Sequence, residues 1–309
     1  TPAPATPPAS IWSVGPIDFS GLIDGYYNFN ANHPASGSNQ FRNFDLRANQ
    51  FSLNMAKLTL SHDADPVGFR VDFGFGRAFD LIHSSEQAPE IFRYLEQVYV
   101  SYKPPALKGF EADFGEFTNS AGAEVIETKD NWNYSRSLLF SYALPYYHFG
   151  LRTSIPIGKS FTAGVQVING WNNIEDDNSG KTIGLTGALT RSKFTWSINY
   201  YFGPEKTDTN TGFRHLYDTT LLLTPTNKVN AYLNFDYGQE RRLFSGIDRW
   251  IGFAGAVHFQ LNDKFAITPR GEYYYDATGF TTGTRQKMNE FTLTGEYKMA
   301  EGLLARFEY

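Results

Sequence analysis

Apolar and polar residues alternate along most of the chain with a period of two. In residues 67–75 (VGFRVDFGF), every second residue is Val or Phe, and the residues between them are Gly, Arg or Asp. Such alternation gives a β-strand one apolar face and one small or polar face. By comparison, apolar residues rarely recur at the spacing of an amphipathic α-helix. The pattern therefore predicts an all-β chain built from half-buried strands.

The alternation predicts about fifteen strands. They are residues 19–29, 55–60, 67–75, 94–102, 110–114, 147–155, 161–167, 183–189, 194–202, 217–223, 229–237, 251–261, 265–275, 291–299 and 303–309. Two of them are irregular, because 55–60 changes phase near Lys57 and 94–102 carries Glu96 on its apolar side.

The connections between these strands alternate in length without exception. Turns of six residues or fewer lie at 61–66, 103–108, 156–160, 190–193, 225–228, 262–264 and 300–302. Longer links lie between them, at 31–50, 77–90, 118–145, 170–180, 203–213, 239–247 and 276–286. This rhythm is typical of an up-and-down antiparallel transmembrane β-barrel, and a Greek-key sandwich has no reason to keep it. Most strands are also long enough to cross the hydrocarbon, and aromatic residues gather near their ends.

An odd number of strands does not suit a closed barrel. Fifteen strands leave the two ends on opposite sides of the membrane, whereas single-chain bacterial barrels use an even number of strands. We therefore expect a barrel of about sixteen strands whose closing C-terminal strand is missing from this chain. The rival explanation is that one predicted strand is false, with 55–60 the weakest.

Composition narrows the class of protein further. The chain has 309 residues, no Cys and a net charge of -5, which excludes disulfides and argues against a nucleic-acid binder. No apolar run approaches the length of a transmembrane helix. Residues 1–14 begin with a Pro/Ala/Thr-rich run and are expected to form a flexible periplasmic linker left after removal of a signal peptide, with trimming as the alternative. Residues 15–309 are expected to form the outer-membrane barrel.

A barrel of this size leaves an aqueous channel, so the polar strand face is the expected functional surface. The predicted channel-lining residues are Asp24, Arg70, Asp72, Glu111, Asp113, Arg152, Asp236, Arg270, Glu272, Glu296 and Arg306, with Glu308 on the same face. Acidic residues outnumber basic ones, which predicts a slight preference for cations. The alternative is that these charges only pair across strands and hydrate the wall.

The longest connection, 118–145, is the second candidate site. A loop of this length with aromatic and apolar residues usually has a function. We expect it to fold into the lumen as a constriction, with Lys129, Asp130, Trp132 and Arg136 near the narrowest point. The alternative is an extracellular lid over the rim.

The sequence contains only incomplete catalytic and metal-binding patterns. The carboxylates of Glu111, Asp113 and Glu116 lie close in sequence, but a hydrolase would need a Ser or His beside Glu111 or Asp113. The six His residues show no metal-binding spacing. Residues 175–180 (EDDNSG) are rich in oxygen ligands, although a solvated turn explains them equally well. No enzyme activity, cofactor or metal is predicted.

Three stretches together resemble a known family. Residues 65–76 (DPVGFRVDFGFG), 129–137 (KDNWNYSRS) and 164–172 (GVQVINGWN) are similar to the β-barrel porin-2 (OmpL-like) family of bacterial outer-membrane proteins. The similarity runs from about Ile17 to Tyr309, and members of the family are longer at the C-terminus. The resemblance implies an outer-membrane diffusion channel and carries over no established substrate residues.

The sequence therefore predicts a bacterial outer-membrane porin that passes small hydrophilic solutes or ions by diffusion. Its expected partners are outer-membrane lipids and those solutes, and a homo-oligomer is left open. The alternatives are an outer-membrane barrel hydrolase and a soluble all-β binding or scaffold protein.

Overall fold

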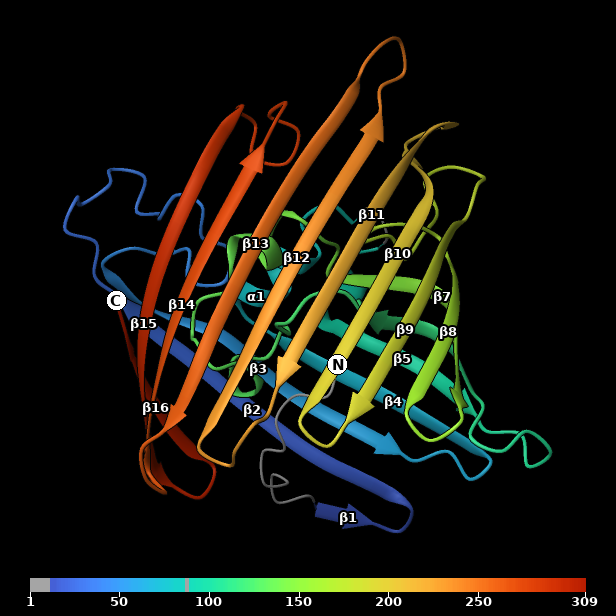
Figure 1. Ribbon diagram of the computed structural model, residues 1–309, viewed down its shortest axis with the longest axis horizontal. Helices are drawn as coiled ribbons and strands as arrows, with labels where there is room; N and C mark the ends of the chain where they lie inside the picture. Colours follow the sequence, from blue (N-terminus) through green and yellow to red (C-terminus); the bar gives the residue numbers. More distant parts are fainter. Residues whose placement is uncertain (1–11, 87–88) are drawn as a thin grey trace.

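The computed structural model describes residues 12–86 and 89–309, which form one strongly curved antiparallel sheet (Figure 1). Sixteen strands follow one another in chain order, and each is hydrogen-bonded to the next, with β1 and β16 at the ends of the order. The strands are β1 (Trp12–Val14), β2 (Ile17–Asn28), β3 (Gln50–His62), β4 (Val67–Phe75), β5 (Leu95–Tyr102), β6 (Glu111–Thr118), β7 (Tyr147–Ile157), β8 (Phe161–Ile168), β9 (Thr182–Arg191), β10 (Phe194–Lys206), β11 (Thr209–Leu223), β12 (Val229–Arg241), β13 (Ile247–Gln260), β14 (Phe265–Asp276), β15 (Gln286–Ala300) and β16 (Leu303–Glu308). This is an up-and-down β-barrel fold, which confirms the predicted fold class.

The fifteen strands predicted from the sequence correspond to β2–β16, so the suggestion that one of them is false is wrong. The additional strand, β1, lies at the end of the expected linker 1–14 and pairs with the start of β2 through the partners Trp12–Phe19 and Val14–Ile17. Gly15 adopts a φ of 61° in the turn between β1 and β2, a backbone conformation that glycine tolerates. The rest of the expected linker, residues 1–11, lies outside the described residues.

In residues 12–86 and 89–309, helical structure is confined to four short elements: α1 (Arg77–Ile82), η1 (Glu90–Tyr94), η2 (Thr128–Asp130) and α2 (Leu138–Tyr142). Within the described part of the chain, no helix is both long enough and apolar enough to span a membrane. These elements lie in the longer connections, and α1 and α2 pack against the inner side of the sheet.

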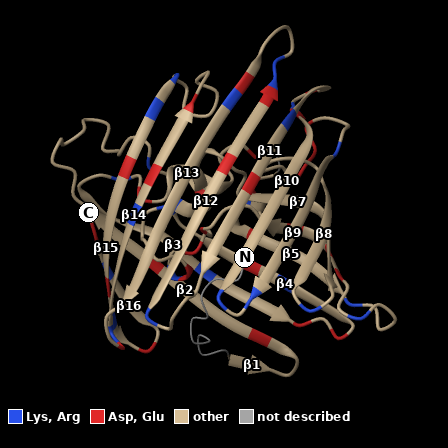
Figure 2. Ribbon diagram, viewed as in Figure 1, with Lys and Arg blue, Asp and Glu red and all other residues tan. Residues whose placement is uncertain are grey.

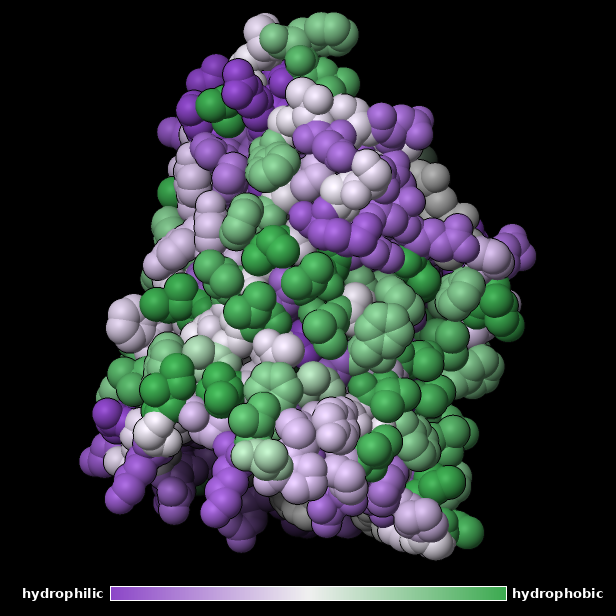
Figure 3. All heavy atoms as spheres, turned by 90° about the vertical axis from the view of Figure 1, so that its right-hand side faces the viewer, coloured by the Kyte–Doolittle hydropathy of each residue, from purple (hydrophilic) through white to green (hydrophobic). Residues whose placement is uncertain are grey.

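Side chains alternate between the two faces of the sheet as the sequence pattern predicts. In β12, Leu233 is 42% exposed on the outer face, whereas its neighbours Tyr232 and Asn234 are buried on the inner face. The same arrangement recurs around the barrel. Figure 3 shows the result on one side of the molecule, where a belt of apolar residues crosses the outer surface between more polar ends. Such a belt matches the lipid-facing band of a membrane barrel.

Two β-bulges explain the two irregular predicted strands. In β3, Asn54 is an extra residue between Leu53 and Met55, which pair with Gly25 and Asp24 of β2. In β5, Glu96 is an extra residue between Leu95 and Gln97, which pair with Phe73 and Asp72 of β4. An extra residue shifts the alternation by one position, so the side chains beyond it change faces. The assignment of Glu96 to the apolar face is therefore wrong, because Glu96 is only 1% exposed and contacts inward-facing Lys57.

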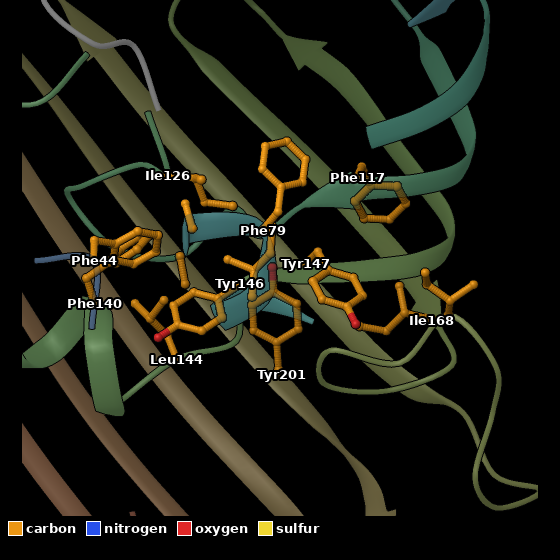
Figure 4. Packing of buried hydrophobic residues seen from close by; sticks show 14 of the residues in the cluster. Phe44, Phe79, Phe117, Ile126, Phe140, Leu144, Tyr146, Tyr147, Ile168 and Tyr201 are labelled. Atoms are coloured by element: carbon orange, nitrogen blue, oxygen red, sulfur yellow. The ribbon is translucent and has the colours of Figure 1, made fainter. Parts of the chain in front are cut away.

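The interior contains packed apolar side chains as well as polar ones. Among the described residues, the larger of two buried clusters joins Phe44 of the 31–50 connection, Phe79 of α1, Phe140 of α2 and wall residues such as Tyr147 and Tyr201. Figure 4 shows their rings gathered inside the sheet. These residues come from connections as well as strands, so three long connections fold inward rather than standing above the rim.

The outward and inward faces should tolerate a charge very differently. Leu233→Arg places a guanidinium on the apolar outer face of β12 and is expected to destabilise the protein by about 2–4 kcal/mol in lipid. Ser197→Arg in β10, which points inward, is the matched control and is expected to cost much less. Urea unfolding of both variants in lipid vesicles measures the difference. Equal losses of stability would contradict the assignment of the faces.

Candidate functional site

The connection between β6 and β7, residues 119–146, lies inside the curved sheet and is called the inner segment here (Figure 1). Its side chains and backbone contact the wall on several sides. Glu127 pairs with Lys57 of β3, the amide N–H of Ala123 donates to Asn234 Oδ1 of β12 at 3.1 Å, and Trp250 Nε1 of β13 donates to the carbonyl of Ala143 at 3.0 Å. The inner segment therefore crosses the barrel interior.

Lys57 stands at the centre of one charged group in the wall. Its Nζ lies 3.0 Å from Glu96 and 3.6 Å from Asp72, and it also contacts Glu127 of the inner segment. Arg70 adds a second cation, 3.0 Å from Asp72. The two bulges make this group possible, because they turn Lys57 and Glu96 to the same face of the sheet as Asp72. We call Lys57, Asp72, Glu96 and Glu127 the Lys57 cluster.

The charge of Glu127 depends on Lys57. Burial alone would raise the pKa of the Glu127 carboxyl, but the neighbouring Lys57 ammonium more than offsets this, and the pKa falls to about 2. Oxygens of Asp72, Glu96 and Glu127 lie within 4.8 Å of one another, close enough to hold a metal ion. The Lys57 ammonium contacts all three carboxylates and already supplies the positive charge that a metal would bring.

Arg270 anchors the other half of the inner segment to β14. Its guanidinium lies 2.9 Å from Glu124, donates to the carbonyl of Ser135 at 2.7 Å, and pairs with Glu272 and Glu290 of the wall at 3.1 and 3.3 Å. Glu272 in turn accepts the amide N–H of Leu138, the first residue of α2, at 2.5 Å. A buried arginine with this many partners fixes the position of the segment that it contacts.

Two residues of β16 satisfy backbone groups at the tip of the inner segment. Glu308 accepts the amide N–H groups of Tyr134 and Ser135 at 2.7 and 3.0 Å. Arg306 donates to the carbonyls of Thr128 and Asn131, both at 2.5 Å, and pairs with Glu296. Here the wall provides the hydrogen bonds that water or a neighbouring strand would otherwise make.

The predicted channel-lining residues all project to the inner side, but they fall into two groups. Asp72, Asp113, Asp236, Arg270 and Glu272 are each less than 10% exposed. Arg270 and Glu272 contact the inner segment, whereas Asp72, Asp113 and Asp236 contact other side chains of the wall. Glu111, paired with Lys103 at 3.3 Å, keeps a third of its side chain exposed, and Arg152 keeps a quarter. Figure 2 shows acidic and basic residues distributed along the strands.

The four residues expected at the narrowest point also differ in environment. Lys129 and Asp130 pair with each other at 2.6 Å and reach water. Trp132 packs against Tyr232 and His258 of the wall. Arg136 instead lies inside the fold of the segment, where it donates to the carbonyls of Val125, Ile126 and Tyr134. Its buried position suits a structural role better than contact with a solute.

Sequence reasoning missed Lys57, Glu96, Glu124 and Glu127 as interior charges. For the first two the signal was present as broken alternation, which marks a bulge. Glu124 and Glu127 lie in a connection, where no period indicates which way a side chain points.

The possible hydrolase and calcium sites are occupied by local contacts. Ser101 Oγ donates to Asp113 at 2.6 Å, but Ser101 is buried and Asp113 also pairs with Arg152 at 2.7 Å. None of the histidine contacts found in the described ranges involves this pair. In residues 175–180, Asp176 accepts the amide of Asn178 and pairs with Lys181.

Comparison with known proteins gives one family match. The family model described as "Putative beta-barrel porin-2, OmpL-like" matches residues 16–309. No curated protein matches the sequence.

Solved structures of outer-membrane proteins share the fold at low sequence identity. OmpF of Salmonella typhi, in complex with daunomycin, is 10% identical with a TM-score of 0.64, over 95% of this chain and 90% of that one. OmpT of Vibrio cholerae in its trimer form is 12% identical with a TM-score of 0.62, over 95% and 87%. The channel DcaP of Acinetobacter baumannii is 11% identical with a TM-score of 0.59, over 97% and 92%.

The stability of the protein should depend on the lysine of the Lys57 cluster. Lys57→Met leaves three buried carboxylates without their shared cation and is expected to cost about 3–5 kcal/mol of stability. Lys129→Met is the control. It breaks the exposed Lys129–Asp130 pair of the inner segment and should cost at most about 1 kcal/mol of stability. Urea unfolding in lipid vesicles distinguishes the two variants, and a Lys57→Met protein as stable as the control would refute the role of Lys57.

Proposed function

Since the chain belongs to the β-barrel porin-2 (OmpL-like) family of outer-membrane porins, we propose that it is a narrow diffusion channel whose inner segment sets the cross-section of the passage. Its location is the bacterial outer membrane. The permeant solutes we propose are small and hydrophilic, and their passage involves no chemistry.

One observation carries this proposal: the inner segment crosses the interior and is held at β3, β12, β13, β14 and β16. A barrel of sixteen strands would otherwise leave a wide channel. A segment of 28 residues (119–146) fixed across it reduces the open area and limits the size of the solute.

Charge on the inner wall supports a preference for cations. Acidic residues outnumber basic ones among the predicted wall residues. The acidic ones are Asp24, Asp72, Glu111, Asp113, Asp236, Glu272, Glu296 and Glu308, and the basic ones are Arg70, Arg152, Arg270 and Arg306. Many of these charges are paired, so the preference arises from the acidic excess and is expected to be small.

Membership of a porin family favours a channel over a hydrolase. The Ser101–Asp113 contact lacks an imidazole partner among the described residues, and the nucleophile would be buried. We also propose that the protein forms homo-oligomers, as supported by the structure of OmpT of Vibrio cholerae in a trimer form.

Removal of the tip of the inner segment should widen the channel. A deletion of residues 124–133 is expected to raise the single-channel conductance in planar bilayers severalfold, since it removes the anchors to Lys57 and Arg270. A deletion of residues 242–245, at the exposed end of the β12–β13 hairpin, is the control and should leave conductance unchanged. Unchanged conductance in both variants would exclude the constriction.

The acidic excess should be visible in ion selectivity. Glu111→Lys changes a partly exposed wall charge and is expected to shift the reversal potential in a salt gradient away from cation preference. Glu301→Lys, in the turn between β15 and β16 and 73% exposed, is the matched control. If both variants keep the wild-type reversal potential, the wall charge does not determine selectivity.

A further inference from the structure

Trp132, in the tip of the inner segment, lies almost parallel to two aromatic rings of the wall. Its ring centre is 5.4 Å from that of Tyr232 with an interplanar angle of 28°, and 5.4 Å from that of His258 with an angle of 23°. Tyr232 and His258 project inward from β12 and β13. Tyr232 pairs with Ala256 and His258 with Asn230, so the two side chains are diagonal neighbours on the inner face. Both wall rings therefore stack against the indole, which remains partly exposed.

We call Trp132, Tyr232 and His258 the aromatic platform. Neighbouring hydrogen bonds hold it in place. Before Trp132, Asn131 donates to the carbonyls of Val125 and Glu127. After it, Asn133 donates to the carbonyl of Thr268 and to Thr294 Oγ1 at 3.2 and 2.7 Å. The two ring nitrogens of His258 contact Thr268 Oγ1 and Gln260 Oε1. A platform fixed in this way pays little ordering cost when a ligand binds.

The indole of Trp132 has a free hydrogen-bond donor. The indole N–H groups of Trp196 and Trp250 donate to Thr219 and to the carbonyl of Ala143. In the part of the chain that the structure describes, Trp132 Nε1 has no such partner, and the side chain is partly exposed. Because an indole N–H normally finds a partner, this donor is available to a solute in the passage.

Charges near the platform are already paired. Arg306, which donates to the carbonyl of Asn131, is bound to Glu296 at 2.9 Å, and Lys129 is bound to Asp130 at 2.6 Å. Other interior rings carry a guanidinium, as Phe44 does with Arg136 and Phe117 with Arg152. No cation of the described residues lies over Trp132. The surroundings therefore suit a neutral solute with hydroxyl groups.

We propose that Trp132, supported by Tyr232 and His258, is a binding site for the ring of a neutral sugar inside the channel. The electron-rich indole face attracts the C–H groups on the apolar face of a pyranose ring. The free N–H donates to a ring or hydroxyl oxygen, and Gln260, which contacts His258, offers a further polar side chain beside the three rings. The site rests on the proposed channel, because a solute reaches it only through the barrel.

The test is the reduction of single-channel current by maltose, which contains pyranose rings, compared with sorbitol, an open-chain polyol with no ring. In the wild-type protein, maltose is expected to reduce the current in a saturable manner, and sorbitol is not. Trp132→Leu is expected to raise the half-maximal maltose concentration by roughly five- to tenfold. Trp132→Phe keeps a ring without the N–H donor and should give an intermediate value. Trp196→Leu, at a lipid-facing tryptophan 45% exposed, is the matched control and should behave as wild type.

The possible results separate this inference from the proposed function. Stable channel steps without a saturable maltose effect overturn the sugar site and leave the channel intact. Equal effects of maltose and sorbitol also overturn it, because a ring is then not required. A Trp132→Leu channel with unchanged maltose response would assign the effect to another part of the wall. The absence of channel steps from inserted wild-type protein contradicts the proposed function itself.

Discussion

The need to satisfy backbone polar groups away from bulk water governs the interior of this barrel. The strands meet this requirement through their ladders, but the inner segment has almost no regular structure and depends on side chains of the wall. Glu308 accepts two of its amides, Glu272 accepts the first amide of α2, and Arg306 donates to two of its carbonyls. Because an unsatisfied buried backbone group is costly, the charges of the wall and the path of the segment determine each other.

This dependence explains why so many inward charges are buried rather than hydrated. Arg270 is 1% exposed, and its partners come from the inner segment and from the wall. Removing one member of such a group leaves an uncompensated charge, whereas an exposed pair such as Lys129–Asp130 contributes little. The inner wall therefore contains charges that hold the segment, buried charges such as Asp113 that pair within the wall, and a set, including Glu111 and Arg152, that water reaches. Only the last set can act directly on a passing ion.

The sequence was sufficient for the fold because period-2 alternation and the rhythm of the connections are both local signals. They located all of β2–β16. They missed β1, whose three residues are too short to show a period. They also gave Glu96 the wrong face, because one inserted residue reverses the alternation without changing the composition. The partners of the inner segment could not be predicted from the sequence for a different reason. Glu124 and Arg270 are 146 residues apart, and no periodic pattern of residues links a connection to a distant strand. The tryptophan at position 132 was singled out, but its support by Tyr232 and His258 depends on how the segment folds.

The order of the anchors along the chain has a consequence for assembly. The inner segment precedes β12, β14 and β16 in the sequence, yet these strands supply most of its hydrogen-bond partners. Until those strands are in place, the backbone amides and carbonyls that they satisfy have only water as a partner. Completing the wall and fixing the segment across the passage are therefore coupled, because the same strands do both.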